Sequence, residues 1–224
     1  MNRTINLASY IDQSLLKSQT TPDDIEKLCK IAHEYGFKSV FVNPVHVKRA
    51  AKALESSPVL IGSVSGFPLG ATTPDVKVYE AEAVENDGAS EVDMVMNIGA
   101  AKSGDYSRIE KEIHSVRKAL AGKTVLKVIL ECTLLSDMGK ATCAKIAADS
   151  GADFVKTSTG IFGQATMEDV ELLFKTVGNR IGVKASGGIR DLKTTLGMIE
   201  AGASRIGTSA GPSIVDEYRN SVSR

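Results

Sequence analysis

The chain alternates short apolar runs with longer segments in which apolar residues return at helical spacing. The short runs are rich in valine, isoleucine and leucine, which is typical of strands buried on both faces of a parallel sheet. We predict eight strands, at residues 8–11, 39–42, 59–64, 91–96, 125–130, 154–157, 181–185 and 205–207. The longer segments between these strands are predicted to be helices.

Several predicted helices begin with a capping sequence. Thr21 offers a side-chain oxygen to the first helix N–H groups, and Pro22 suits the first helical position. Asp23 places a negative charge near the positive end of the helix. Comparable helix starts are expected at Thr73, Ser136, Thr166 and Asp191.

Glycines mark the expected helix ends. They precede predicted strands at Gly88, Gly151 and Gly202, with a looser copy at Gly36. A glycine just past a helix readily takes the left-handed conformation that ends it. Strands and helices that alternate with short joints imply parallel pairing, and eight such units predict a TIM (β/α)8 barrel rather than a doubly wound sheet. A length of 224 residues suits one barrel, so we expect a single domain over residues 1–224.

Composition narrows the function and the setting. Aromatic residues make up 5% of the chain and tryptophan is absent, so the core must be built mainly from aliphatic side chains. Basic and acidic residues each number 27, and this balance argues against a dedicated nucleic-acid surface. The three cysteines are scattered, no apolar leader opens the chain and no run is long enough to cross a membrane. We therefore expect a cytoplasmic protein with neither a membrane nor a nucleic-acid partner.

Three charged residues stand within the apolar strands, toward the ends where a TIM barrel carries its active site. Asp93 lies in the fourth predicted strand, Lys156 in the sixth and Lys184 in the seventh. Buried charges are costly unless they have partners or a function. Because the sixth and seventh strands are neighbours in a barrel, both lysines are expected to point into its mouth.

Two ammonium groups held close together cannot both stay charged at low cost, and a neutral lysine amine is a nucleophile. An exposed lysine has a pKa of ~10.4, so reactivity near neutral pH needs a shift of roughly three units, or roughly 4 kcal/mol. Asp93 can then move protons on and off the substrate, directly or through water. The alternative is a structural ion pair between Asp93 and one lysine, with no catalytic role.

Two further charged residues belong to the fifth predicted strand and its end. Lys127 and Glu131 lie four residues apart, so strand alternation puts them on the same face, where they either pair or tune the site. Because Lys127 sits deeper in its strand, we interpret it as a supporting residue. The three histidines, His33, His46 and His114, show no ligand spacing. No metal cluster appears in the sequence, so we expect chemistry that proceeds through an imine and not through a metal ion.

The loops after the last two strands predict a phosphate site. The seventh strand runs into Gly187 and Gly188, and the eighth into Gly207, Thr208 and Ser209. Many TIM barrels bind phosphate at this place, with glycines that let backbone N–H groups approach the anion and hydroxyls that add donors. One glycine pair alone indicates only a tight turn, but two such loops at the expected strand ends support a phosphate ligand.

Taken together, these motifs resemble the deoxyribose-phosphate aldolase family. The resemblance runs from about Tyr10 to Gly211. It is carried by GFPLGAT at 66–72, EVDMV at 91–95, LKVILE at 126–131, GADFVKTSTG at 151–160, VKASGGIR at 183–190 and RIGTS at 205–209.

The resemblance implies reversible cleavage of 2-deoxy-D-ribose 5-phosphate to D-glyceraldehyde 3-phosphate and acetaldehyde, with no metal or organic cofactor, in an enzyme that commonly forms a homodimer. It implies that Lys156 is the Schiff-base lysine, that Lys184 lowers its pKa and helps to move protons, and that Asp93 is the proton donor and acceptor. The substrate-binding residues that it implies are Asp12, Lys127, Thr159, Gly160, Gly187, Gly188, Gly207, Thr208 and Ser209.

The chain also departs from the family pattern. Gln13 and Ser14 stand where many members have His-Thr, and residues 161–164 form an unusual segment after Gly160. The tail around Tyr218 does not match the terminal tyrosine that helps proton transfer in some members. Two other functions fit the same residues: an imine-forming aldolase or transaldolase for another sugar phosphate, and a sugar-phosphate binder without catalysis.

Overall fold

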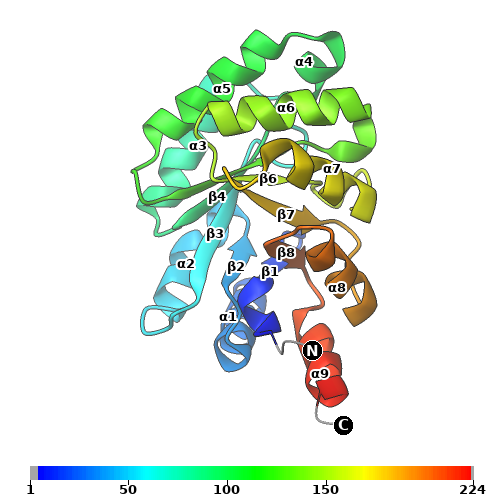
Figure 1. Ribbon diagram of the computed structural model, residues 1–224. Helices are drawn as coiled ribbons and strands as arrows, with labels where there is room; N and C mark the ends of the chain where they lie inside the picture. Colours follow the sequence, from blue (N-terminus) through cyan, green and yellow to red (C-terminus); the bar gives the residue numbers. More distant parts are fainter. Residues whose placement is uncertain (1–4, 223–224) are drawn as a thin grey trace.

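The computed structural model describes residues 5–222, over which eight parallel strands close into a barrel, with β1 paired to β8 (Figure 1). The strands are β1 (Ile11–Leu15), β2 (Ser39–Val42), β3 (Leu60–Ser65), β4 (Glu91–Val95), β5 (Val125–Ile129), β6 (Phe154–Lys156), β7 (Gly182–Ser186) and β8 (Arg205–Thr208). This closed order confirms the predicted TIM (β/α)8 fold.

Helices cover the outside of the barrel (Figure 1). Within the described residues they are α1 (Pro22–Tyr35), α2 (Val47–Ala53), α3 (Pro74–Asn86), α4 (Ile98–Ser103), α5 (Tyr106–Ala119), α6 (Asp137–Asp149), α7 (Met167–Val177), α8 (Leu192–Glu200) and α9 (Gly211–Val222). Short 3-10 turns form η1 (Leu7–Tyr10), η2 (Pro44–His46) and η3 (Cys132–Leu134). None of the helices between residues 5 and 222 is long and apolar enough to cross a membrane.

The predicted helix boundaries are largely confirmed. Thr21 and Asp24 form a reciprocal capping box at the start of α1. Side chains of Ser136, Thr166 and Asp191 accept backbone N–H groups of α6, α7 and α8. Thr73 precedes α3 without such a bond, so α3 depends on Pro74 at its first position. The glycines that precede strands all have positive φ, at Gly36, Gly88, Gly151 and Gly202.

The predicted first strand was wrong. Residues 8–11 fall mainly in the η1 turn, and β1 runs from Ile11 to Leu15. The strand was missed because Asp12, Gln13 and Ser14 interrupt its apolar pattern. Asp12 is buried in the barrel among charged groups, while the Gln13 amide donates to the Ser209 carbonyl and accepts from Gly211 N–H.

The outer face of the sheet is apolar, whereas its inner face carries charged side chains. Between the strands and the helices lies an aliphatic core that includes Val92, Leu126 and Val155, as the composition predicted. Strand alternation turns the neighbouring residues, such as Asp93 and Lys127, toward the barrel interior. The interior is therefore lined by buried charges, which positions them directly beneath the C-terminal ends of the strands.

Candidate active site

Asp93 joins the two lysines predicted to share the barrel mouth. Lys156 on β6 and Lys184 on β7 are register partners, and each places its Nζ 2.8 Å from the same oxygen of Asp93, Oδ2. Both ammonium groups therefore compete for one carboxylate oxygen. The predicted proximity of the two lysines is confirmed.

A second layer of charges lies beneath this trio. Lys184 Nζ is also 2.7 Å from Asp12 Oδ2, and Arg205 Nε is 2.8 Å from the other oxygen of Asp12. Lys127 Nζ is 2.5 Å from Glu91 Oε2 and 3.3 Å from Asp93 Oδ1. The residues of this interior network are Asp12, Glu91, Asp93, Lys127, Lys156, Lys184 and Arg205.

The interior network holds four basic side chains against three carboxylates. A buried excess of positive charge is unfavourable in a medium of low polarity, and it disappears when one lysine loses its proton. The balance of charges thus favours one neutral amine, as the sequence argument required.

Asp12 and Asp93, two carboxylates of the network, are held in the ionised form by the cations around them. Burial opposes ionisation of Asp12, but Lys184, Lys127 and Arg205 outweigh it and lower the pKa of Asp12 to about 2. For Asp93 as well, burial is outweighed by Lys156, Lys184 and Lys127, so its pKa lies well below the usual range. Asp12 and Asp93 therefore both carry a negative charge near neutral pH.

Burial makes Lys184 easier to deprotonate than an exposed lysine. It lowers the pKa of Lys184 to about 8, against the attraction of Asp12 and Asp93 and with the help of the charges on Lys156 and Lys127. For Lys127 the carboxylates outweigh burial, and its pKa lies above the ordinary value. Lys127 thus keeps its charge, which suits the supporting role expected of it.

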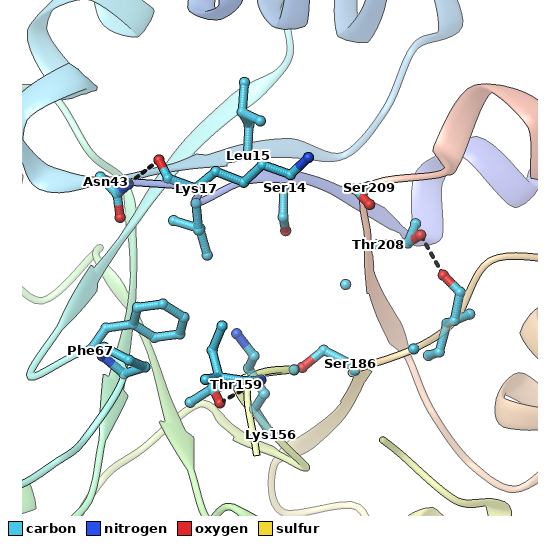
Figure 2. A pocket seen from close by; sticks show the side chains of 18 of the residues that line it. Ser14, Leu15, Lys17, Asn43, Phe67, Lys156, Thr159, Ser186, Thr208 and Ser209 are labelled. Atoms are coloured by element: carbon cyan, nitrogen blue, oxygen red, sulfur yellow. Dashed lines mark hydrogen bonds between the residues drawn. The ribbon is translucent and has the colours of Figure 1, made fainter. Parts of the chain in front are cut away.

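A cavity of about 660 Å³ opens above the network at the C-terminal ends of the strands. Lys156 is the member of the interior network that lines it; Lys184 is fully buried behind. Figure 2 shows the Lys156 amine directed into the space between Phe67, Ser14 and Ser186. A carbonyl compound in this cavity can therefore reach Lys156 and not Lys184.

The predicted phosphate loops lie along the same cavity. Its walls include Thr159, Gly160, Gly187, Gly188, Gly207, Thr208 and Ser209. The Thr208 hydroxyl donates to the Ile189 carbonyl at 2.7 Å and accepts from Ala210 N–H at 2.9 Å, so it holds the two loops together. Asp12 and Lys127, which the resemblance places with the substrate-binding residues, do not line the cavity; they lie in the network below it.

Two cations on the cavity wall were not predicted to bind the substrate. Lys17 follows β1 and Arg190 follows the Gly187–Gly188 turn, and both line the cavity. Figure 2 shows Lys17 along the rim beside Ser14. The signal that could have found Lys17 was its position just past a strand, and it was missed because β1 was predicted several residues too early.

Glu131 contacts Thr159 and does not form the expected pair with Lys127. Strand β5 ends at Ile129, so alternation does not extend to Glu131, which takes a left-handed conformation with φ of 56°. Its carboxylate accepts from the backbone N–H and the hydroxyl of Thr159, at 3.0 and 2.6 Å. Glu131 thus braces the Thr159 loop on the cavity wall.

The remaining unusual segments are accounted for by local contacts. Gln164, in the 161–164 segment, packs over Gly188, where an added Cβ would come within 2.7 Å of it. The hydroxyl of Tyr218 accepts from Ile5 N–H at 3.0 Å, beside an apolar cluster of α8 and α9. Within residues 5–222, no group of three His, Cys, Asp or Glu side chains is placed to hold a metal ion.

Comparisons with known proteins agree with this geometry. The family model described as DeoC/LacD family aldolase matches residues 6–216. A Brevibacillus brevis protein named deoxyribose-phosphate aldolase is 53% identical, over 94% of this chain and 96% of its own. A protein of that name from Halalkalibacterium halodurans is 52% identical, over 98% of both chains.

Solved structures of other aldolases have a similar fold. A structure described as "QR15, an Aldolase" has a TM-score of 0.92 and 41% identity, over 97% of each chain. A deoxyribose phosphate aldolase from Aeropyrum pernix, described as having a unique tetrameric structure, has a TM-score of 0.89 and 34% identity, over 95% of this chain and 91% of its own.

Proposed function

The chain belongs to the DeoC/LacD family of aldolases, and from this premise we propose how its site cleaves 2-deoxy-D-ribose 5-phosphate reversibly to D-glyceraldehyde 3-phosphate and acetaldehyde. One observation carries the assignment of roles. Lys156 shares Asp93 Oδ2 with a second lysine, and it is the member of the interior network that reaches the cavity. Lys156 is therefore the nucleophile.

The covalent steps begin at the aldehyde of the open-chain sugar. The neutral Lys156 amine adds to C1, and loss of water leaves an iminium ion. The C2–C3 bond then breaks: its electron pair moves toward the iminium nitrogen to give an enamine, while the C3 hydroxyl loses its proton and C3 becomes the aldehyde of D-glyceraldehyde 3-phosphate. Protonation of the enamine at C2 and addition of water release acetaldehyde and restore the amine.

Asp93 and Lys184 handle the protons of this cycle. Asp93 stays ionised and orients both amines through one oxygen, while Lys184, with a pKa of about 8, can give and take a proton near neutral pH. We propose that protons pass between this pair and the substrate through water held in the cavity. The buried position of Lys184 prevents it from forming an imine itself.

The phosphate binds at the part of the cavity wall formed by the loops after β7 and β8. The Gly187–Gly188 turn, where both glycines have positive φ, and Ser209, which directly follows β8, offer backbone N–H groups. Lys17 and Arg190, which also line the cavity, add positive charge. Binding the phosphate there extends the sugar toward Lys156 and fixes which end of the substrate meets the amine.

Borohydride trapping tests the nucleophile. Reduction in the presence of acetaldehyde should leave a stable adduct on Lys156, located by peptide mass spectrometry, and Lys156→Leu should lose both the adduct and sugar-phosphate cleavage. An adduct on another lysine would overturn the assignment. A preference for dihydroxyacetone over acetaldehyde as the donor would instead favour a related aldolase or transaldolase.

The expectation of a cytoplasmic homodimer stays a prediction. A related protein is described as tetrameric, so association differs from a dimer in at least one relative. Sedimentation equilibrium of the purified chain measures the oligomeric state directly, and a single species of twice the monomer mass would support the dimer.

A further inference from the structure

Phe41 presents an aromatic ring to the lysines of the barrel interior. It lies on β2, fully buried, in register with Gly62 of β3. An added Cβ at Gly62 would come within 2.3 Å of the Phe41 ring, so glycine leaves the space that the ring fills. The position of the ring is thus set by close packing on the strand beside it.

The face of this ring meets one lysine more closely than the others. The distance from the ring centroid to Nζ is 3.6 Å for Lys184, 4.6 Å for Lys127 and 6.0 Å for Lys156. The negative face of an aromatic ring attracts a cation within about 6 Å, and the attraction is strongest where water is excluded. Phe41 therefore favours positive charge on Lys184 over positive charge on Lys156.

We propose that Phe41 is a positioning residue for the aldolase reaction: its ring stabilises the ammonium form of Lys184 and so leaves Lys156 as the amine that loses its proton. This inference rests on the proposed function, because it explains which of two neighbouring lysines becomes the nucleophile. The ring also contributes no proton and no hydrogen bond, so it can bias the charge without taking part in proton transfer.

Such a bias is needed because Lys184 is itself close to losing its proton. Burial lowers its pKa to about 8. If Lys184 became neutral first, Lys156 would keep its proton beside Asp93 and could not attack a carbonyl. For two coupled amines, a small difference in environment decides which one is neutral. The charged groups that face Lys184 are Asp12 on β1, Asp93 on β4, Lys127 on β5 and Lys156 on β6, with Glu91 and Arg205 behind them.

Fluorination of Phe41 tests the proposal with little change of shape. Fluorine withdraws the negative charge from the ring face, so one, three and five fluorines should weaken the attraction stepwise. The titration midpoint of Lys184, followed through the NMR signal of ¹³C-labelled Lys Cε, should fall in the same order, by up to about one pH unit. Borohydride trapping of acetaldehyde on Lys156 at neutral pH should slow in parallel, by about threefold to tenfold.

Phe37 provides the matched control. It is buried but packs against Tyr35, outside the barrel interior, and its fluorination should change neither the Lys184 midpoint nor the trapping rate. Phe41→Leu, which removes the ring, should act in the direction of the most fluorinated side chain. Unchanged midpoints and rates across the Phe41 series, or equal changes at Phe37, would overturn the proposal. Absence of any adduct on Lys156 would contradict the proposed function, whereas the Lys184 midpoint would still test the role of Phe41.

Discussion

The two lysines of the site share a single carboxylate partner, Asp93. Asp93 Oδ2 receives Lys156 and Lys184 at the same distance of 2.8 Å, so the carboxylate does not distinguish between the two amines. Their difference lies in access, because Lys156 lines the cavity while Lys184 is enclosed. Reactivity at Lys156 therefore depends on the charge of a neighbour that never meets the substrate.

Replacing that neighbour should make Lys156 inert near neutral pH. In Lys184→Met the interior keeps three cations for three carboxylates, and Lys156 no longer has an electrostatic reason to release its proton. Trapping of acetaldehyde at neutral pH should slow by about 100-fold, and its pH dependence should move to higher pH. Lys184→Arg retains the charge and should trap faster than the Met variant. Equal trapping by the two variants would contradict a role for the charge.

Lys17 should matter for the phosphate and not for the imine. In Lys17→Met, kcat/KM for 2-deoxy-D-ribose 5-phosphate should fall by about tenfold or more through KM, since one cationic contact is lost. The Lys17→Met variant should cleave unphosphorylated 2-deoxy-D-ribose as fast as the unchanged chain does. Lys30→Met, which removes an exposed charge of α1 that pairs with Glu34, serves as the control. An equal loss with both sugars would show that Lys17 does not contact the phosphate.

Among the secondary-structure elements, those with a clear apolar period were predicted well. Strands β2 and β5 and the capped starts of α1 and α6 follow from local sequence. The polar strand β1 did not, because its side chains are satisfied by distant partners such as Ser209 and Gly211. The motif residues Asp93, Lys156 and Lys184 could be predicted to meet, whereas the pairing of Lys127 with Glu91 needed the strand register.

A buried ion pair links two helices to the end of β4. Lys77 of α3 and Glu112 of α5 pair with each other, Lys77 also donates to the Val95 carbonyl at 2.7 Å, and Glu112 accepts from Asn97 N–H at 3.3 Å. Burial lowers the pKa of Lys77 and raises that of Glu112, against the attraction between the two. The pair thus ties α3 and α5 to the end of β4, just beyond Asp93.

Removing one partner of this ion pair should lower the free energy of unfolding far more than replacing both partners by apolar residues. Glu112→Leu leaves a buried ammonium without its carboxylate and should lower the free energy of unfolding by about 3–5 kcal/mol. Adding Lys77→Met should recover most of the loss, because two apolar side chains can fill the space. Glu171→Leu breaks an exposed pair with Lys175 and should cost less than about 1 kcal/mol. Urea unfolding measures all three, and a double variant no more stable than Glu112→Leu would refute the explanation.

Over the whole molecule, stability and reactivity come from opposite faces of one sheet. The aliphatic layer between strands and helices supplies the apolar burial that holds the barrel closed, while the charges inside depend on one another. The composition predicted the aliphatic outer layer, because aliphatic residues are numerous in the chain. The composition could not predict the charged interior, because only a few charged residues, far apart in the sequence, form that interior.

The charged interior should make the fold sensitive to acid in a defined range. Asp12 has a pKa of about 2 in the folded chain against 3.8 as its ordinary value. A carboxyl whose pKa is lowered by folding contributes stability that is complete above the ordinary value and is lost as pH falls through the folded one. The urea midpoint should therefore stay level down to about pH 4 and fall steeply toward about pH 2.

The variant Asp12→Asn separates this cause from general acid damage. It should be less stable at neutral pH, because Lys184 and Arg205 lose a carboxylate, and its midpoint should fall less steeply between pH 3.8 and about 2. Asp149→Asn breaks an ion pair with Arg180 that is about half exposed, and its curve should run parallel to that of the unchanged chain. If Asp12→Asn also ran parallel, the acid sensitivity would have to arise outside the barrel interior, and the ion pairs of Asp12 would not be what acid disrupts.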